Sequence, residues 1–144
     1  ETEEMFTQSL NLVAEAQLTH LHVFPYSVRP GTPAARMPQV PGDVIRERAA
    51  RLRAVGDAAM TSFMQAQIGK TTDVLIERDA EGHCARYLPV RLREIDPLPE
   101  PGSIVSVCIT GMDGAFLTAR PVSPSLPADL SPHRGLDEPH RYSA

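Results

Sequence analysis

The chain has 144 residues with a formal net charge of −4, and 42% of its residues are hydrophobic. This length fits one ordinary domain or two small ones, and the apolar content excludes a fully disordered chain. No apolar run reaches the roughly 20 residues needed to cross a bilayer, and the acidic charge excludes a strongly basic nucleic-acid-coating protein. The two cysteines, Cys84 and Cys108, form no CxxC pair, which argues against a zinc ribbon or a disulfide scaffold and favours a reducing, cytoplasmic environment.

The N-terminal residues predict a helix followed by a single strand. Thr2 suits the N-cap position, and acidic residues follow it in the first turn. Residues 3–16 carry apolar side chains at spacings of four and three, which predicts an amphipathic helix. Residues 18–26 are rich in apolar, aromatic and β-branched side chains and predict a buried strand. One strand cannot form a parallel sheet, and the chain does not begin with Met, so we expect a fragment of a longer protein.

A proline-rich loop and a long helix come next. Five prolines between residues 25 and 41 predict a loop with little regular structure. Residues 42–67 repeat apolar side chains at spacings of four and three, which predicts one long helix that ends near Gly69. Its arginines are expected on a solvated surface with partners four residues away, and a phosphate-binding track is the alternative. These arginines are Arg46, Arg48, Arg51 and Arg53, with Glu47 as a partner for Arg51.

The apolar period changes from about 3.6 to 2 after residue 70. Short antiparallel strands separated by glycine turns predict a small barrel of the oligonucleotide-binding type. Residues 121–144 hold five prolines and hardly any apolar pattern, which predicts a disordered tail. The four expected strands are centred on residues 74–76, 88–92, 105–109 and 116–120, with turns at 79–82 and 111–114.

Residues 22–35, His-Val-Phe-Pro-Tyr-Ser-Val-Arg-Pro-Gly-Thr-Pro-Ala-Ala, are the most specific text in the chain. They resemble the C-terminal part of the radical-SAM tRNA methylthiotransferases, whose last barrel strand ends in Pro-Tyr-Ser-x-Arg-Pro-Gly-Thr-x-Ala before a long helix. The spelling His-Val-Phe-Pro-Tyr-Ser is most similar to the branch acting on threonylcarbamoyl-adenosine beside the anticodon. Residues 1–4 resemble the end of a Gly-Phe-Pro-Gly-Glu-Thr stretch in that family, and residues 74–77 resemble the start of its TRAM domain. The likeness covers about residues 1–120.

The resemblance implies an α+β fragment with three parts. Residues 1–68 would be the last helix and strand of a radical-SAM α/β barrel with a long linking helix. Residues 69–120 would form a small antiparallel TRAM β-barrel of the OB-like type, followed by the tail at 121–144. The parent enzyme would insert a methylthio group into a modified adenosine with SAM and two [4Fe–4S] clusters. Neither cysteine matches the family's Cys-x3-Cys-x2-Cys loop, so we expect this fragment alone to bind no cofactor or metal and to be inactive.

The same resemblance points to a small-molecule pocket. The carboxyl ends of the strands face the active site in a barrel of this type. Tyr26, Ser27 and Arg29 are therefore expected near SAM or the modified base, where Arg29 suits a carboxylate or phosphate. The alternative is a structural loop in which Arg29 tethers the chain to the preceding helix. His20 and His22 have a spacing that can bind metal, but we expect packed or hydrogen-bonded histidines there.

The TRAM resemblance also implies contact with tRNA, and the expected partner is the anticodon stem-loop. Tyr87 offers a ring on which an unpaired base can stack, next to basic residues on or beside the first strands. The alternative is an ordinary solvated face, because four acidic residues share this region. The expected tRNA-binding residues are Lys70, Arg78, Arg86, Tyr87, Arg91 and Arg93.

Two other functions stay open from the sequence. One is a free-standing RNA-binding module in which residues 1–68 only pack onto the barrel. The other is an assembly piece whose helix dimerises and whose barrel binds nothing. The apolar stripes of 18–26 and 45–66 would be covered by the missing N-terminal part of the enzyme. In the separate chain we expect them to cause self-association or partial unfolding of the N-terminal third. No membrane partner is expected.

Overall fold

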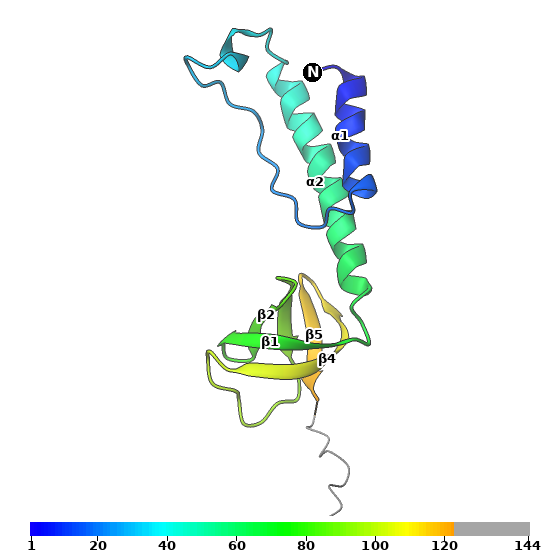
Figure 1. Cartoon of the computed structure of the whole chain (residues 1–144), viewed down its shortest axis with the longest axis vertical. Helices are drawn as coiled ribbons and strands as arrows, with labels where there is room; N and C mark the ends of the chain where they lie inside the picture. The colour runs from blue at the N-terminus through cyan, green and yellow to red at the C-terminus, as the bar shows by residue number, and fades with distance from the viewer. Residues whose placement is uncertain (123–144) are drawn as a thin grey trace, which may run out of the picture.

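The computed structural model describes residues 1–122, and the predicted disordered tail lies outside the described residues except for its first two positions. Two helices and a long extended segment form one end of the molecule, and a β-barrel forms the other (Figure 1). Within residues 1–122 no helix has the length and apolar character of a membrane span. The elements are α1 (Glu3–Glu15), a 3₁₀ turn (Ala34–Arg36), α2 (Gly42–Gln65), β1 (Thr71–Arg78), β2 (Glu81–Cys84), β3 (Pro89–Leu92), β4 (Ile104–Asp113) and β5 (Phe116–Pro121).

The two helices follow the predicted pattern. The Thr2 side chain accepts a hydrogen bond from the Met5 backbone N–H at 3.2 Å, as an N-cap should. α1 packs beside the first half of α2 (Figure 1). The long helix ends two residues earlier than expected, at Gln65, and Ala66 is its C-cap. Gly69 instead has a φ of 83° at the turn into the barrel, a backbone conformation that favours glycine.

The prediction of a strand over 18–26 is wrong for this chain. These residues run along α2 in an extended conformation without ladder hydrogen bonds. Leu21 and Val23 are half-buried, whereas the alternate Phe24 is 83% exposed. The alternation matches a strand, but a strand needs a hydrogen-bonded neighbour, and residues 1–122 place none beside it.

The prediction of a barrel is confirmed, but the barrel has five strands and the sequence predicts four. The sequence predicts no strand at β2 and places its first two residues in a turn, because Glu-Gly-His-Cys has little strand propensity. It is a strand because it pairs on both sides: Val74 lies opposite Cys84, and Gly82 opposite Val90. Gly82 is required there, since a Cβ at this position would overlap the carbonyl oxygen of Leu75.

The barrel is also not wholly antiparallel, as the sequence led us to expect. Its strands close in the order β1-β2-β3-β5-β4, and β3 pairs with β5 in the parallel sense. Directions cannot alternate around a ring with an odd number of strands, so one neighbouring pair must be parallel. The core inside the ring is apolar, and Met64 from the end of α2 joins it, which ties the helix to the barrel.

Candidate nucleic-acid interface

The structure divides the barrel's basic residues into two groups. Arg91 pairs with Glu81 at 2.8 Å, and Arg93 pairs with Asp113 at 2.6 Å. Arg120 pairs with an acid on the loop after β3 in the same way. The remaining three form no ion pair within residues 1–122, namely Lys70, Arg78 and Arg86. In the part of the chain that the structure describes, no carboxylate therefore neutralises these three cations.

Arg91 is held against the barrel by more than one contact. Its guanidinium lies 4.3 Å from the centroid of the Phe116 ring, and its Nη1 lies 3.4 Å from Asp113. It projects outward, as expected, because the neighbouring Val90 and Leu92 point into the core. Its charge is thus shared with two carboxylates, and phosphate would have to compete with them. Contact of Arg91 and Arg93 with tRNA stays a prediction, and in this arrangement both arginines already have carboxylate partners.

The turn between β2 and β3 presents Tyr87 to solvent. The residue is 81% exposed, while the flanking Cys84 and Leu88 are buried in the core. The turn is closed by two backbone hydrogen bonds, from Tyr87 N–H to Cys84 at 2.9 Å and from Cys84 N–H to Leu88 at 3.1 Å. Tyr87 has a φ of 57°, which bulky residues rarely adopt. A firmly anchored backbone therefore carries an outward-pointing aromatic ring.

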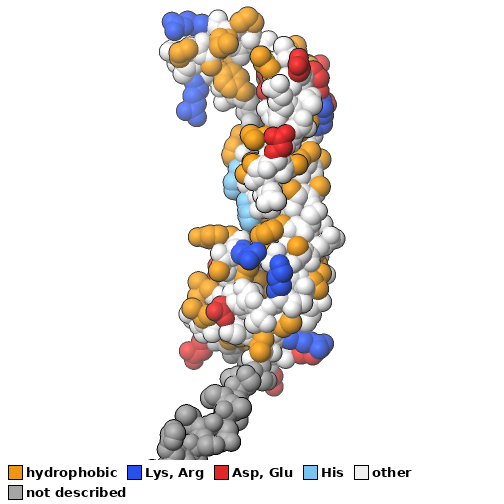
Figure 2. Space-filling view, turned by 45° about the vertical axis from the view of Figure 1, so that its right-hand side comes forward, with side chains coloured by type: hydrophobic (Ala, Val, Ile, Leu, Met, Phe, Trp, Pro, Cys, Tyr) orange, Lys and Arg blue, Asp and Glu red, His pale blue; other side chains and the backbone are white. Residues whose placement is uncertain are grey.

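Arg86, the neighbour of Tyr87, reaches across to α2. Its guanidinium lies 5.9 Å from the centroid of the Phe63 ring, within the range of a cation–π contact. The His20 ring also meets the Phe63 ring edge-on, with centroids 6.4 Å apart. Figure 2 shows His side chains beside the helices and Lys or Arg side chains on the nearest part of the barrel. The junction of helix and barrel thus gathers aromatic and basic groups.

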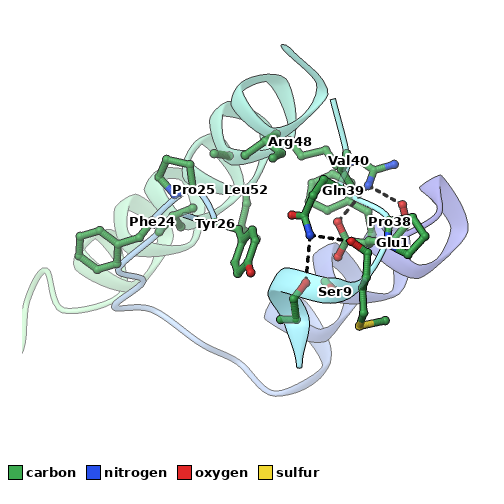
Figure 3. A pocket seen from close by; sticks show the side chains of 16 residues that line it. Glu1, Ser9, Phe24, Pro25, Tyr26, Pro38, Gln39, Val40, Arg48 and Leu52 are labelled. Atoms are coloured by element: carbon green, nitrogen blue, oxygen red, sulfur yellow. Dashed lines mark hydrogen bonds and ion pairs between the residues drawn. The ribbon is translucent and has the colours of Figure 1, made fainter. Parts of the chain in front are cut away.

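A second candidate site is an open apolar cavity of about 410 Å³ between α1, α2 and the proline-rich loop. Figure 3 shows Phe24 and Tyr26 on one side and Glu1, Gln39 and Arg48 on the other. The wall is mostly carbon, so the cavity suits an apolar group better than a charged one.

Of the residues expected near SAM or the modified base, only Tyr26 lines this cavity. Ser27 and Arg29 are exposed on the loop beyond it. The Arg29 carbonyl accepts two hydrogen bonds from Thr32, one from the backbone at 3.3 Å and one from the hydroxyl at 2.9 Å. The Arg29 guanidinium forms no ion pair with any residue in 1–122. The structure therefore does not bring the three together around one pocket.

The prediction of a solvated surface position is wrong for Arg48, which is buried. Its guanidinium bonds Glu1 at 3.0 Å and Glu3 at 3.2 Å, and it lies over the Phe6 ring at 5.3 Å. Arg51 also bonds Glu3, at 2.6 Å, and pairs with Glu47 as predicted. The hydrogen bond from Arg51 is the main cause that lowers the pKa of the Glu3 carboxyl. This clasp joins α1 to α2 across more than forty residues of sequence, so helical spacing gave no signal for it.

The described residues do not fit an iron–sulfur cluster. Cys84 is buried in the barrel core, and Cys108 is half-buried on β4, with β1 between the two strands. Within residues 1–122 no three His, Cys, Asp or Glu side chains cluster as a metal site would require. The Nδ1 atom of His20 lies 3.0 Å from the Thr19 hydroxyl, and its ring meets the Phe63 ring edge-on, so this exposed histidine is a hydrogen-bonded one.

Comparison with known proteins defines the class of protein. No family model matches the chain. It is 41% identical over 117 residues to the threonylcarbamoyladenosine tRNA methylthiotransferase MtaB of Rickettsia prowazekii, covering 81% of this chain and 27% of that protein. It is also similar to the tRNA-2-methylthio-N(6)-dimethylallyladenosine synthases of Acidothermus cellulolyticus and Kineococcus radiotolerans. Those matches are 40% identical (76% of this chain, 24% of that protein) and 37% identical (85% and 27%).

The chain is therefore a relative of the tRNA methylthiotransferases, as the motif at residues 22–35 indicated. It spans about a quarter of the length of these curated relatives, which is consistent with a C-terminal fragment of such an enzyme.

Proposed function

We propose that this chain is the C-terminal portion of a tRNA methylthiotransferase and that it positions the tRNA. The parent enzyme would insert a methylthio group into a modified adenosine next to the anticodon, in the cytoplasm. The observation that carries the proposal is the 37–41% identity over about four-fifths of the chain to proteins named for that activity. SAM and two [4Fe–4S] clusters would be held by the rest of the enzyme, so the fragment alone is inactive.

Residues 1–68 would complete a radical-SAM barrel in this proposal. Residues 18–26 alternate as a strand does, and one face packs on α2 while Phe24 stays 83% exposed. An extended segment with free backbone groups on both sides can take a neighbouring strand from the N-terminal part of the enzyme. The apolar cavity, with Tyr26 in its wall, would then lie between this strand and the helices. Phe24 would face the interior of the assembled barrel, with Ser27 and Arg29 at its rim.

Residues 69–120 would serve as the TRAM barrel that grips the anticodon stem-loop. This role is supported by the exposed Tyr87 and by Lys70, Arg78 and Arg86, which form no ion pair within residues 1–122. These cations would give the barrel a local positive surface for an anionic partner, although the overall charge of the chain is −4. The modified adenosine would be the threonylcarbamoylated one, as the text of residues 22–27 favours, with the dimethylallylated one as the alternative.

The test is binding of the 144-residue chain to a tRNA transcript, followed by fluorescence anisotropy. If three cations of the barrel, Lys70, Arg78 and Arg86, each displace one counterion, the logarithm of the affinity falls against the logarithm of the salt concentration with a slope of about −2 to −3. A duplex DNA of equal length is the control for general anion binding. Absence of binding at about 50 mM salt, or binding that ignores salt, would overturn the proposed role in positioning tRNA.

A further inference from the structure

We propose that the turn between β2 and β3 is a clamp for one unpaired nucleotide. Tyr87 stacks on the base, Arg86 binds the adjoining phosphate, and Phe63 of α2 positions Arg86. This inference rests on the proposed function and deepens it, because it names a single-stranded nucleotide at the junction of helix and barrel. It also adds Phe63, which the sequence did not indicate.

The exposure of Tyr87 favours an unpaired base over a duplex. Tyr87 is 81% exposed on a turn that two backbone hydrogen bonds fix to the core. A flat, exposed ring gains most by stacking on a base whose own faces are free, whereas bases in a duplex already stack on each other. A loop nucleotide can leave its stack at small cost, so the partner is the loop of a stem-loop.

The setting of Arg86 favours a phosphate beside that base. It forms no ion pair within residues 1–122, and its guanidinium carbon lies over the Phe63 ring, 5.9 Å from the centroid. The N–H groups at the edge of the guanidinium stay available, and their fork matches two phosphate oxygens. Arg86 and Tyr87 are adjacent in sequence, as their ligands, a base and its phosphate, are adjacent in RNA.

The backbone of Tyr87 supplies an independent observation. A φ of 57° is strained for tyrosine, and glycine or asparagine would occupy it more easily. Packing of the ring does not offset the cost of this strain, because the side chain lies in solvent. Residues with a strained backbone that no packing interaction offsets cluster at binding sites. Glycine at this position would give a more relaxed turn without the ring.

The paired arginines on the same barrel provide the contrast. Arg93 bonds Asp113 at 2.6 Å, so its charge is already matched. It is half-exposed, as a phosphate ligand would be, yet its loss removes little free charge. The clamp therefore predicts that Arg86 and Arg93 differ in their effect on RNA although both are surface arginines.

The experiment measures binding of the full chain to an anticodon stem-loop RNA that carries 2-aminopurine in the loop, with the blunt duplex stem as the control ligand. Tyr87→Ala and Tyr87→Gly are expected to weaken stem-loop binding about tenfold and to abolish the fluorescence change. Tyr87→Phe restores both, and Tyr87→Gly keeps the melting temperature at or above the parent value. Arg86→Ala reduces the salt slope by about one, and Arg93→Ala leaves it unchanged.

Phe63→Leu keeps an apolar side chain against the barrel core and removes the ring beneath Arg86. It is expected to weaken stem-loop binding several-fold while leaving duplex-stem binding unchanged. The clamp is overturned if the parent chain binds the stem-loop but Tyr87→Ala and Arg86→Ala stay within twofold of it, and the proposed function then survives. If the parent chain binds no RNA, both the clamp and the tRNA-positioning role are overturned.

Discussion

Leu21 of the extended segment lies directly against Gly56 of α2: a Cβ added to the glycine would come within 3.1 Å of the leucine Cβ. The absence of a side chain at Gly56 therefore allows the segment to approach the helix backbone. This contact fixes which side chains of the segment point away from the helix, including Phe24.

Replacing Gly56 with leucine is expected to displace the extended segment. Overpacking of this kind costs about 1–3 kcal/mol, which outweighs the gain in helix propensity from removing a glycine. Hydrogen–deuterium exchange should show faster exchange in α1 and residues 18–26, with the barrel unchanged. Gly42→Leu is the matched control, because a Cβ there meets only the end of the Arg46 side chain at 3.8 Å. Equal exchange in both variants would show that the segment is not packed as described.

Gly82→Ala is expected to disrupt the barrel itself. The new methyl group would overlap the Leu75 carbonyl on β1, and backbone cannot move aside as a flexible side chain can. We expect a loss of about 3 kcal/mol or more, at the upper end of overpacking costs. Gly111→Ala is a milder control, since it meets only the Thr118 hydroxyl at 3.2 Å. Denaturant unfolding of the two variants gives the comparison, and similar midpoints would contradict the close approach of β1 and β2.

The barrel could be predicted from the sequence because its strands carry period-two apolar residues and are separated by glycine turns. β2 could not, since only its pairing partners make Glu-Gly-His-Cys a strand. The strand predicted over 18–26 has the right side chains but no neighbour within residues 1–122. The alternation of apolar residues predicts which face of a strand is buried, but it cannot predict whether a neighbouring strand is present.

Only part of the candidate site could be predicted from the sequence. Tyr87 and Arg86 could be named because aromatic and basic residues are adjacent there. The neutralisation of Arg91 and Arg93 by Asp113 depends on contacts spanning about twenty residues, which no local pattern encodes. The same holds for Arg48, whose partners precede it by more than forty positions.

The ion pairs between α1 and α2 are expected to make stability depend on pH at the acidic end. The folded chain lowers the pKa of Glu3 from its ordinary value of 4.5, chiefly through the hydrogen bond from Arg51. The folded state therefore favours the carboxylate. Its contribution is present above pH 4.5 and is lost as the pH falls through the lowered folded-state pKa.

Glu3→Gln should accordingly melt below the parent chain at neutral pH, and the difference should shrink as the pH falls below 4.5. Glu4→Gln is the matched control, since Glu4 forms no ion pair within residues 1–122. Melting curves over an acid series provide the measurement. A Glu3→Gln effect that grows with acidity would contradict the assigned role of this carboxylate.

The exposed apolar side chains around the cavity are expected to make the separate chain self-associate. Phe24 is 83% exposed and Met37 64% exposed, and both line the same open cavity. Sedimentation velocity should show a concentration-dependent shift that Phe24→Ser combined with Met37→Ser weakens. Leu98→Ser is the control, because Leu98 is 58% exposed on the loop between β3 and β4, away from the cavity. A monomer at every concentration would contradict the expectation.

The most direct test of the proposed function is a chimera of the Rickettsia prowazekii relative in which this chain replaces the matching segment. The chimera would be produced in cells that lack the corresponding enzyme, and their tRNA nucleosides would be measured by mass spectrometry. The account predicts a methylthio-modified adenosine with the chimera and none with a version that ends before residue 69. A soluble chimera that leaves the adenosine unmodified, while the unaltered relative modifies it, would contradict the account.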